Sequence, residues 1–204
     1  MSRDASWVIY RSVTDFSHGY SDSYEYILRV TGTATVNDML YWVLENDDGE
    51  FDSYIRVAND IVYTFAGIAD FGSSGDSSDS DNDTPNPYED ELPLLRLYLE
   101  SDTTYDIMSY SSSEFGASFT LTWIGRYMGT EDITVTAGTF ESCRKYEITY
   151  DAVAVGGGAA QREITTTLLW LAPDVGTVRS VETKTDGEQT IYKSEEELIG
   201  FSIP

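Results

Sequence analysis

Hydrophobic side chains recur at every second position through most of this sequence. The segments 24–30 (YEYILRV), 119–123 (FTLTW), 146–150 (YEITY) and 164–170 (ITTTLLW) show the pattern. Successive side chains of a β-strand point to opposite faces of a sheet, so a period of two predicts strands with one buried face. The 15 tyrosines and 8 phenylalanines favour the same structure, because aromatic side chains pack well on a pleated surface.

Turn signals separate these runs at short intervals. Turns are predicted at Asn46–Gly49, Asn59–Asp60, Gly156–Gly158, Pro173–Gly176 and Asp186–Gly187. Tight turns join antiparallel strands, so we expect an all-β fold with at most minor α content. The expected architecture is a strongly curved antiparallel meander sheet or half-barrel of about ten to twelve strands. The sequence is compatible with one short helix, at Tyr88–Tyr98 or at Ser194–Leu198.

The length of 204 residues suits a single β domain spanning 1–204. One segment interrupts the pattern: Gly72–Asp90 reads GSSGDSSDSDNDTPNPYED and contains neither a bulky aliphatic residue nor a base. Strand patterning resumes on both sides of it. We therefore interpret residues 72–90 as an acidic low-complexity insertion between two strands, and not as a linker between domains.

The charge balance restricts the partners of this protein. The chain carries 36 Asp and Glu against 12 Lys and Arg, a formal net charge of −24. Such a surface repels phosphate backbones and anionic headgroups, which excludes nucleic acid as a partner. It suits divalent cations, basic partners or a medium of high salt. Two origins explain the acidity equally well: a salt-adapted organism, or an ordinary organism's acidic exported protein. No apolar run is long enough to form a transmembrane segment.

The acidic insertion contains the best candidate for a metal site. The spacing Asp79-x-Asp81-x-Asp83 places three carboxylates on one side of a short loop, which suits Ca²⁺. The match to a calcium-binding loop is incomplete, because Thr84 stands where the turn needs glycine and Asp90 where a longer glutamate is usual. A solvated acidic loop explains the same residues. The candidate ligands are Asp76, Asp79, Asp81, Asp83 and Asp90.

The residues of an enzyme active site are not recognisable. His18 is the sole histidine and lies in a polar turn without an evident partner, which disfavours a Ser-His-Asp or Cys-His hydrolase. Cys143 is the sole cysteine, so no intramolecular disulfide forms, and a thiol on a strand is usually a small buried apolar group. Carboxylates are too numerous for their spacing to identify a glycosidase pair. We therefore expect a non-enzymatic protein without a cofactor, calcium excepted.

Five aromatic residues admit two roles. They are expected in the core, although a curved sheet could instead leave some of them lining an open concavity that binds an apolar group or a sugar ring. The five are Trp7, Tyr10, Trp42, Trp123 and Trp170.

Three segments of the C-terminal half form a recognisable pattern over about Thr130 to Ile203. The first is the hairpin VTAGTF at Val135–Phe140, followed by Cys143 and then by Tyr-Glu at 146–147. The second is WLAPDVGTV at Trp170–Val178, and the third is the closing ELIGF at Glu197–Phe201. In order and spacing these segments resemble a diffuse group of bacterial exported proteins and lipoproteins.

This resemblance implies a fold similar to the half-barrel of periplasmic lipoprotein carriers, in which a curved sheet wraps a hydrophobic concavity. It implies tight turns at Gly138 and Gly176 and packing roles for Phe140 and Trp170, and it carries over no catalytic residue. It also implies an exported protein in the periplasm, at the cell surface or outside the cell, with Met1 standing in place of a removed leader.

Together these observations predict a cell-envelope or extracellular binding module of unknown ligand. Its concave face would hold an apolar or lipid-like molecule or a protein partner. The alternative is a structural subunit that assembles with itself into a surface layer, filament or adhesive structure, with Ca²⁺ bridging its acidic loops. Neither the ligand-binding residues nor the oligomeric state follow from the sequence.

The calcium hypothesis has a direct test. If Asp79, Asp81 and Asp83 hold the cation, calorimetric titration of the wild type with Ca²⁺ gives a binding isotherm that Asp81→Ala abolishes, because one charged oxygen ligand is lost. The absence of heat in both proteins would reject the site and leave a solvated loop.

Overall fold

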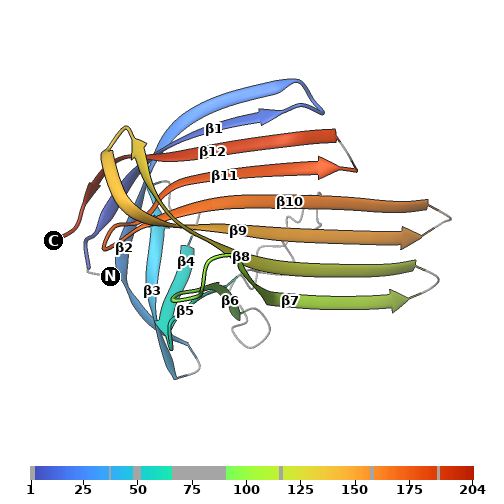
Figure 1. Ribbon diagram of the computed structural model, residues 1–204, viewed down its shortest axis with the longest axis horizontal. Helices are drawn as coiled ribbons and strands as arrows, with labels where there is room; N and C mark the ends of the chain where they lie inside the picture. The colour runs from blue at the N-terminus through green and yellow to red at the C-terminus, as the bar shows by residue number, and fades with distance from the viewer. Residues whose placement is uncertain are drawn as a thin grey trace.

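The computed structural model describes residues 3–36, 38–47, 52–65, 91–114, 117–156, 159–187 and 189–204. Within these residues the chain forms one 12-stranded sheet and no helix (Figure 1). The strands are β1 (Ser6–Asp15), β2 (Tyr20–Val36), β3 (Met39–Asn46), β4 (Asp52–Ala58), β5 (Ile61–Phe65), β6 (Glu91–Arg96), β7 (Thr103–Glu114), β8 (Ala117–Val135), β9 (Gly138–Gly156), β10 (Ala159–Ala172), β11 (Gly176–Asp186) and β12 (Gln189–Ser202).

The sheet is antiparallel throughout and follows the chain, with one exception. Its order is β6-β5-β4-β3-β2-β1-β12-β11-β10-β9-β8-β7, so the first and last strands pair in the middle of the sheet. The two edge strands, β6 and β7, are therefore neighbours in sequence. The sheet curls on itself into a nearly closed barrel, with β6 brought back beside β7 (Figure 1).

These findings confirm the predicted all-β, strongly curved meander, and they correct one detail. Neither short helix forms: Glu91–Arg96 is β6, and Ser194–Leu198 lies within β12. The glutamates at 195–197 favour a helix locally, but pairing with β1 and β11 on both sides overrides that preference. The first residues of the range Tyr88–Tyr98 lie outside the described residues.

Predicted turns that lie within the described residues adopt the backbone geometry that their residues suggest, while Asn46–Gly49 and Gly156–Gly158 fall partly outside them. Asn59 and Asp60 both have positive φ, at 50° and 63°, as the two central residues of a tight β4–β5 hairpin require. Gly138 and Gly176 have φ of 139° and 100°, conformations that side chains rarely adopt. The tight-turn roles expected for these two glycines are therefore confirmed.

Two tyrosines on the same face of the sheet close the barrel. The hydroxyl of Tyr105 on β7 donates to the carbonyl of Leu94 at 3.1 Å, and that of Tyr146 on β9 donates to the carbonyl of Arg96 at 3.2 Å. Both acceptor carbonyls belong to β6. The face of β7–β9 that carries these tyrosines is therefore the inner surface of the barrel.

A polar cluster fixes the short strands β3 to β6 together. Glu91 accepts hydrogen bonds from Arg56 at 2.7 and 3.0 Å and from the hydroxyl of Tyr41 at 2.5 Å. The guanidinium group of Arg56 also lies 4.1 Å from the ring centroid of Tyr63. Because only 16% of the Arg56 side chain and 17% of the Glu91 side chain are exposed, loss of either charge would leave the other in a poorly hydrated place.

The buried apolar side chains form two clusters. One fills the closure between β6 and β7–β9: Leu92, Leu95, Tyr105, Ile107, Tyr127, Tyr146 and Ile148. The other lies where the tip of the β8–β9 hairpin folds against β12, with Ala137 N donating to Leu198 O at 3.0 Å. Its buried members are Ala5, Trp7, Val30, Leu44, Val135, Cys143, Trp170, Ala172, Val178 and Leu198.

Most of the predicted aromatic core is confirmed. Trp7 and Trp170 are buried, and Trp42 packs against the second cluster as a partly buried side chain. Trp123 takes the other expected role, because it packs against the first cluster and also lines an open concavity. Tyr10 is an error of the prediction, since 36% of it is exposed. It lies three residues after Trp7 on β1, and an odd spacing along a strand places two side chains on opposite faces.

The closure depends on one glycine. Gly125 on β8 pairs with Tyr105 on β7, and the tyrosine ring lies across it. A Cβ at position 125 would stand 2.3 Å from Cζ of Tyr105, far inside van der Waals contact. The bare backbone of Gly125 thus lets Tyr105 lie flat and reach β6.

We expect Gly125→Ala to destabilise the protein by about 1–3 kcal/mol, because the methyl group displaces the Tyr105 ring and its hydrogen bond to β6. The measurement is equilibrium unfolding in urea. Gly32→Ala is the matched control, since a Cβ there meets nothing within 4 Å. Equal losses of unfolding free energy in the two variants would contradict the role assigned to Gly125.

Candidate functional site

A cavity of about 1020 Å³ lies inside the barrel. Leu94 of β6 lines it from one side, and residues of β8 to β12 line it from the other. A second cavity, of about 620 Å³, lies at the ends of β7 to β10 and shares Phe119, Ala154 and Gln161 with the first. The two cavities therefore adjoin at these three residues. The predicted concave face is present.

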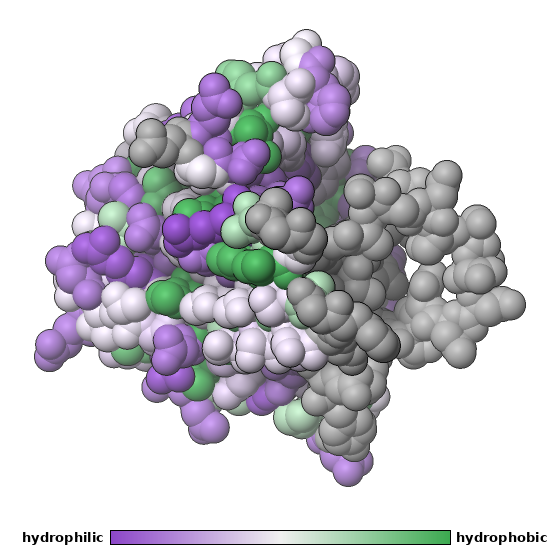
Figure 2. Space-filling view, turned by 90° about the vertical axis from the view of Figure 1, so that its right-hand side faces the viewer, coloured by the Kyte–Doolittle hydropathy of each residue, from purple (hydrophilic) through white to green (hydrophobic). Residues whose placement is uncertain are grey.

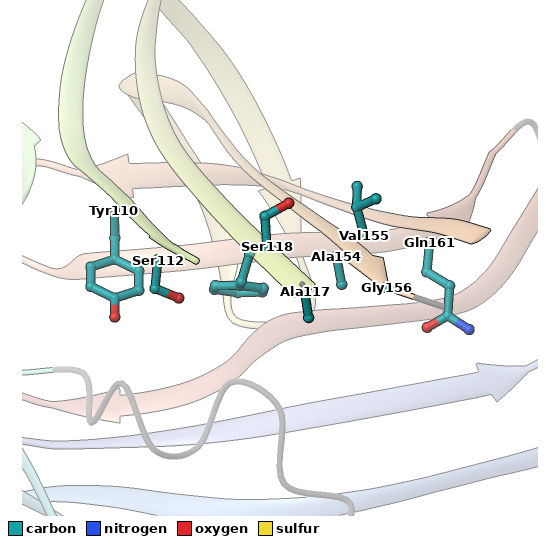
Figure 3. Close-up of a pocket in the computed structure, with 9 residues that line it drawn as sticks. Tyr110, Ser112, Ala117, Ser118, Ala154, Val155, Gly156 and Gln161 are labelled. Atoms are coloured by element: carbon teal, nitrogen blue, oxygen red, sulfur yellow. The ribbon is translucent and has the colours of Figure 1, made fainter. Parts of the chain in front are cut away.

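The described ends of β7, β8, β9 and β10 lie at the outer edge of these cavities. Tyr110 and Gln161 point to the same side of the sheet there, whereas Val155 points to the opposite side (Figure 3). The space-filling view from this end shows patches of hydrophobic residues between hydrophilic ones (Figure 2).

One wall of the cavity is apolar and aromatic. It comes from β8 and β9, whose alternation places every second residue inward. Trp123 and Tyr150 are direct cross-strand partners, and their rings meet edge to face with centroids 6.1 Å apart. Burial, and after it the charge of Glu163, raises the pKa of Tyr150. The inward residues of this wall are Phe119, Trp123, Ile148, Tyr150, Ala152 and Ala154.

The opposite wall is polar and charged. On β11, Glu182, Lys184 and Asp186 occupy alternate positions and all line the cavity. Glu163 of β10 pairs directly with Asp186, and its Oε1 lies 3.7 Å from Nζ of Lys184. Thr165 and Thr167 of β10 complete this wall. The interior is thus amphipathic, with an apolar half and an acidic half.

A hydrogen-bonded network continues the polar surface deeper into the barrel. Glu196 of β12 accepts from the hydroxyls of Tyr26 and Ser180, each at 3.0 Å. Arg11 of β1 lies 3.6 Å from the same carboxylate and donates to Ser194 at 3.1 Å. Burial and the adjacent Glu196 charge raise the pKa of Tyr26 well above its ordinary value.

Sequence reasoning had not identified the residues of the polar wall. Charged or polar residues at 182, 184 and 186 share one face by strand period, but the period does not tell which face is inward. The inward direction is decided by the closure of β6 onto β7–β9. A ligand-binding surface was predicted without residues, and the structure supplies candidates for it: Glu163, Glu182, Lys184, Asp186 and Glu196.

His18 has partners that the sequence did not reveal. Its Nδ1 lies 2.8 Å from Oδ2 of Asp15 and 3.0 Å from Oγ of Ser17, and Ser17 also donates to Asp15 at 2.5 Å. The hydrogen bonds from Ser17 and then His18 hold the pKa of the Asp15 carboxyl far below its usual range. The statement that His18 lacks an evident partner was therefore wrong.

The geometry of this trio nevertheless differs from that of a catalytic triad. In a triad the carboxylate contacts one ring nitrogen and the serine the other, whereas here both contact Nδ1 of His18. The Ser17 hydroxyl donates to Asp15 instead of to the ring. The three side chains stabilise the exposed β1–β2 turn.

Cys143 is buried, as the sequence predicted. It is fully inaccessible, and its Sγ donates to the carbonyl of Phe140 at 3.5 Å within the second apolar cluster. Burial, followed by the negative charges of Asp132 and Glu131, raises the pKa of the thiol. The thiolate, which is the reactive form, is thereby disfavoured.

The predicted metal ligands Asp76, Asp79, Asp81, Asp83 and Asp90 lie outside the described residues. Among the residues that the structure does describe, no group of three or more His, Cys, Asp or Glu side chains could hold a metal ion. The calcium site stays a prediction. In the same described ranges, no helix is long and apolar enough to cross a membrane.

Comparison with solved structures shows the fold. The chain is similar to a candidate lipoprotein from Parabacteroides distasonis, with a TM-score of 0.54 and 18% identity over 98% of this chain and 96% of the other. A candidate exported protein with a YmcC-like fold from Bacteroides fragilis aligns over 99% and 97% of the two chains, at 13% identity and a TM-score of 0.43. The latter similarity is too low to carry an argument. No family model and no curated protein matches the sequence.

We expect Cys143 to react with a thiol reagent at pH 8 at least about 100-fold more slowly in the folded protein than in denaturant, because the thiol is inaccessible and its thiolate is disfavoured. The control is Ser111→Cys in a Cys143→Ala chain, where the new thiol stands at an exposed position of β7. Labelling of folded wild type as fast as this control would contradict the buried role.

Proposed function

We propose that this protein is a non-enzymatic binding protein that holds an amphiphilic, lipid-like molecule inside its barrel. The observation that carries the proposal is the cavity of about 1020 Å³ with an apolar aromatic wall facing a charged one. A purely apolar ligand would gain nothing from the charged wall and would remove water from the half-buried Glu182. A purely polar ligand would gain little from Trp123 and Tyr150.

The size of the cavity fits this ligand class. Ligand sites commonly measure about 300–1000 Å³, so this one is large enough for a chain of about ten methylenes together with a polar head. Burial of that chain contributes about 8 kcal/mol before the costs of association. The outer edge at the described ends of β7 to β10 gives the ligand a route into the interior without opening the closure at β6.

We further propose that the protein works outside the cytoplasm, in the cell envelope or beyond. The residues that support this are those of the VTAGTF hairpin and the two later segments, which resemble bacterial exported proteins. The fold shared with a candidate lipoprotein agrees with that context. The buried state of Cys143 and the arrangement at His18 give no support to an enzymatic role.

The proposal predicts saturable binding of a neutral amphiphile. Dodecyl maltoside, added below its micellar concentration, should form a one-to-one complex in native mass spectrometry and shift tryptophan emission to shorter wavelength, because Trp123 lines the cavity and the alkyl chain displaces water from it. Ala152→Phe should weaken binding at least about tenfold, since its ring occupies the chain site.

Val153→Phe is the matched control for that experiment. Residue 153 neighbours 152 on β9 and points to the opposite face of the sheet, so the same added ring should leave binding unchanged within about twofold. Unchanged binding in Ala152→Phe, or no binding by the wild type, would reject the cavity as the ligand site.

A further inference from the structure

The polar wall of the cavity carries an unbalanced charge. Three carboxylates, of Glu163, Glu182 and Asp186, share it with one ammonium group, that of Lys184. Glu163 and Asp186 stand directly opposite each other on paired strands, an arrangement that is unfavourable for like charges. Lys184 contacts Glu163 at 3.7 Å, which leaves the other two carboxylates without this cation.

The other charged groups around the cavity do not supply the missing positive charge. Arg162 lines the rim, but its guanidinium group donates to both carboxylate oxygens of Asp151, at 2.9 and 2.7 Å. Deeper in the barrel, Arg11 is matched by Glu196. The described inner surface therefore stays negative in this region, at Glu182 and Asp186.

The aromatic side chains of the interior suit a cation as well. Ring faces attract ammonium groups within about 6 Å, most strongly where water is partly excluded. The interior already contains one such contact, because Nζ of Lys184 lies 5.8 Å from the ring centroid of Tyr192. Tyr150, on the strand next to β10, brings a further ring close to Glu163, as the effect of that carboxylate on its pKa shows.

We propose that the ligand is a cationic amphiphile, with an ammonium head at Glu182 and Asp186 and its alkyl chain along the aromatic wall. This inference rests on the proposed function and specifies its substrate class. A positive head relieves the repulsion between Glu163 and Asp186. A carboxylate or phosphate head would add to that repulsion, so anionic lipids are selected against.

The charge of the whole protein acts in the same direction. A net charge of −24 raises the local concentration of cations and speeds their association. Salt screens this long-range part, whereas contacts inside the cavity are screened less. Preference for a cationic head should therefore decrease with salt but persist at high salt.

The test compares heads of different charge on the same C12 chain. Dodecyltrimethylammonium, dodecyl maltoside and laurate are titrated by calorimetry below their micellar concentrations, at low and at high salt. We expect the cation to bind at least about tenfold more tightly than the maltoside, because two carboxylates lie near its head. Laurate should bind more weakly than both, because the same carboxylates repel its head.

Variants of the polar wall locate the head. Glu182→Gln combined with Asp186→Asn should reduce the preference for the cation about tenfold, while Lys184→Met should increase it, because a competing ammonium group is removed. Glu147→Gln combined with Glu25→Gln is the control. It removes the same number of charges from residues that pair with Leu168 and Tyr10 on the other face, and the preference should be unchanged.

The outcomes separate this inference from the proposed function. Equal binding of the three C12 compounds, or tighter binding of laurate, would overturn the cationic head and leave an amphiphile-binding cavity. Binding of none of them would overturn both. A preference that the control variant reduces as much as the cavity variant would assign the effect to the overall charge of the protein and reject the head site.

Discussion

The contact of β6 with the inner face of β7–β9 is the constraint on which the rest of the structure depends. A 12-stranded meander has two edge strands, each with unpaired backbone groups that tend to pair with other chains. The hydroxyls of Tyr105 and Tyr146 donate hydrogen bonds to backbone carbonyls of β6, and an apolar cluster that includes both tyrosines packs between β6 and β7–β9. This contact turns a curved sheet into a barrel and defines which face is interior.

The interior that results is not a uniform hydrophobic core. Its buried clusters lie at the closure and at the end where the β8–β9 hairpin folds against β12, while the middle of the barrel is partly open and partly charged. Burying charge costs free energy unless each group has a partner. Glu196 meets this condition with two hydrogen-bond donors and the nearby Arg11 guanidinium group, whereas Glu182 is half-buried and Asp186 is exposed to water.

Local clusters and binding sites are distinct in this protein. The contacts among Asp15, Ser17 and His18 unite three residue types known from hydrolases, yet they come from one turn and share a single ring nitrogen. The cavity wall draws its carboxylates from two strands that only the sheet register brings together. The former kind of cluster lies within four residues of the sequence, whereas the latter depends on a strand pairing that spacing along the chain does not give.

The sequence by itself determined the strands, the turns and the curvature class, because these depend on alternation along one segment and on residues such as Asn59, Asp60 and Gly138. It also indicated that Cys143 and Trp170 would be buried, since a thiol on a strand and a large aromatic side chain are usually packed away from water. The tertiary structure decided where β6 closes, that the glutamates at 195–197 extend instead of coiling, and that Glu163 faces Asp186. These features depend on contacts between residues far apart in the chain, and a period of two is the same whichever face turns inward.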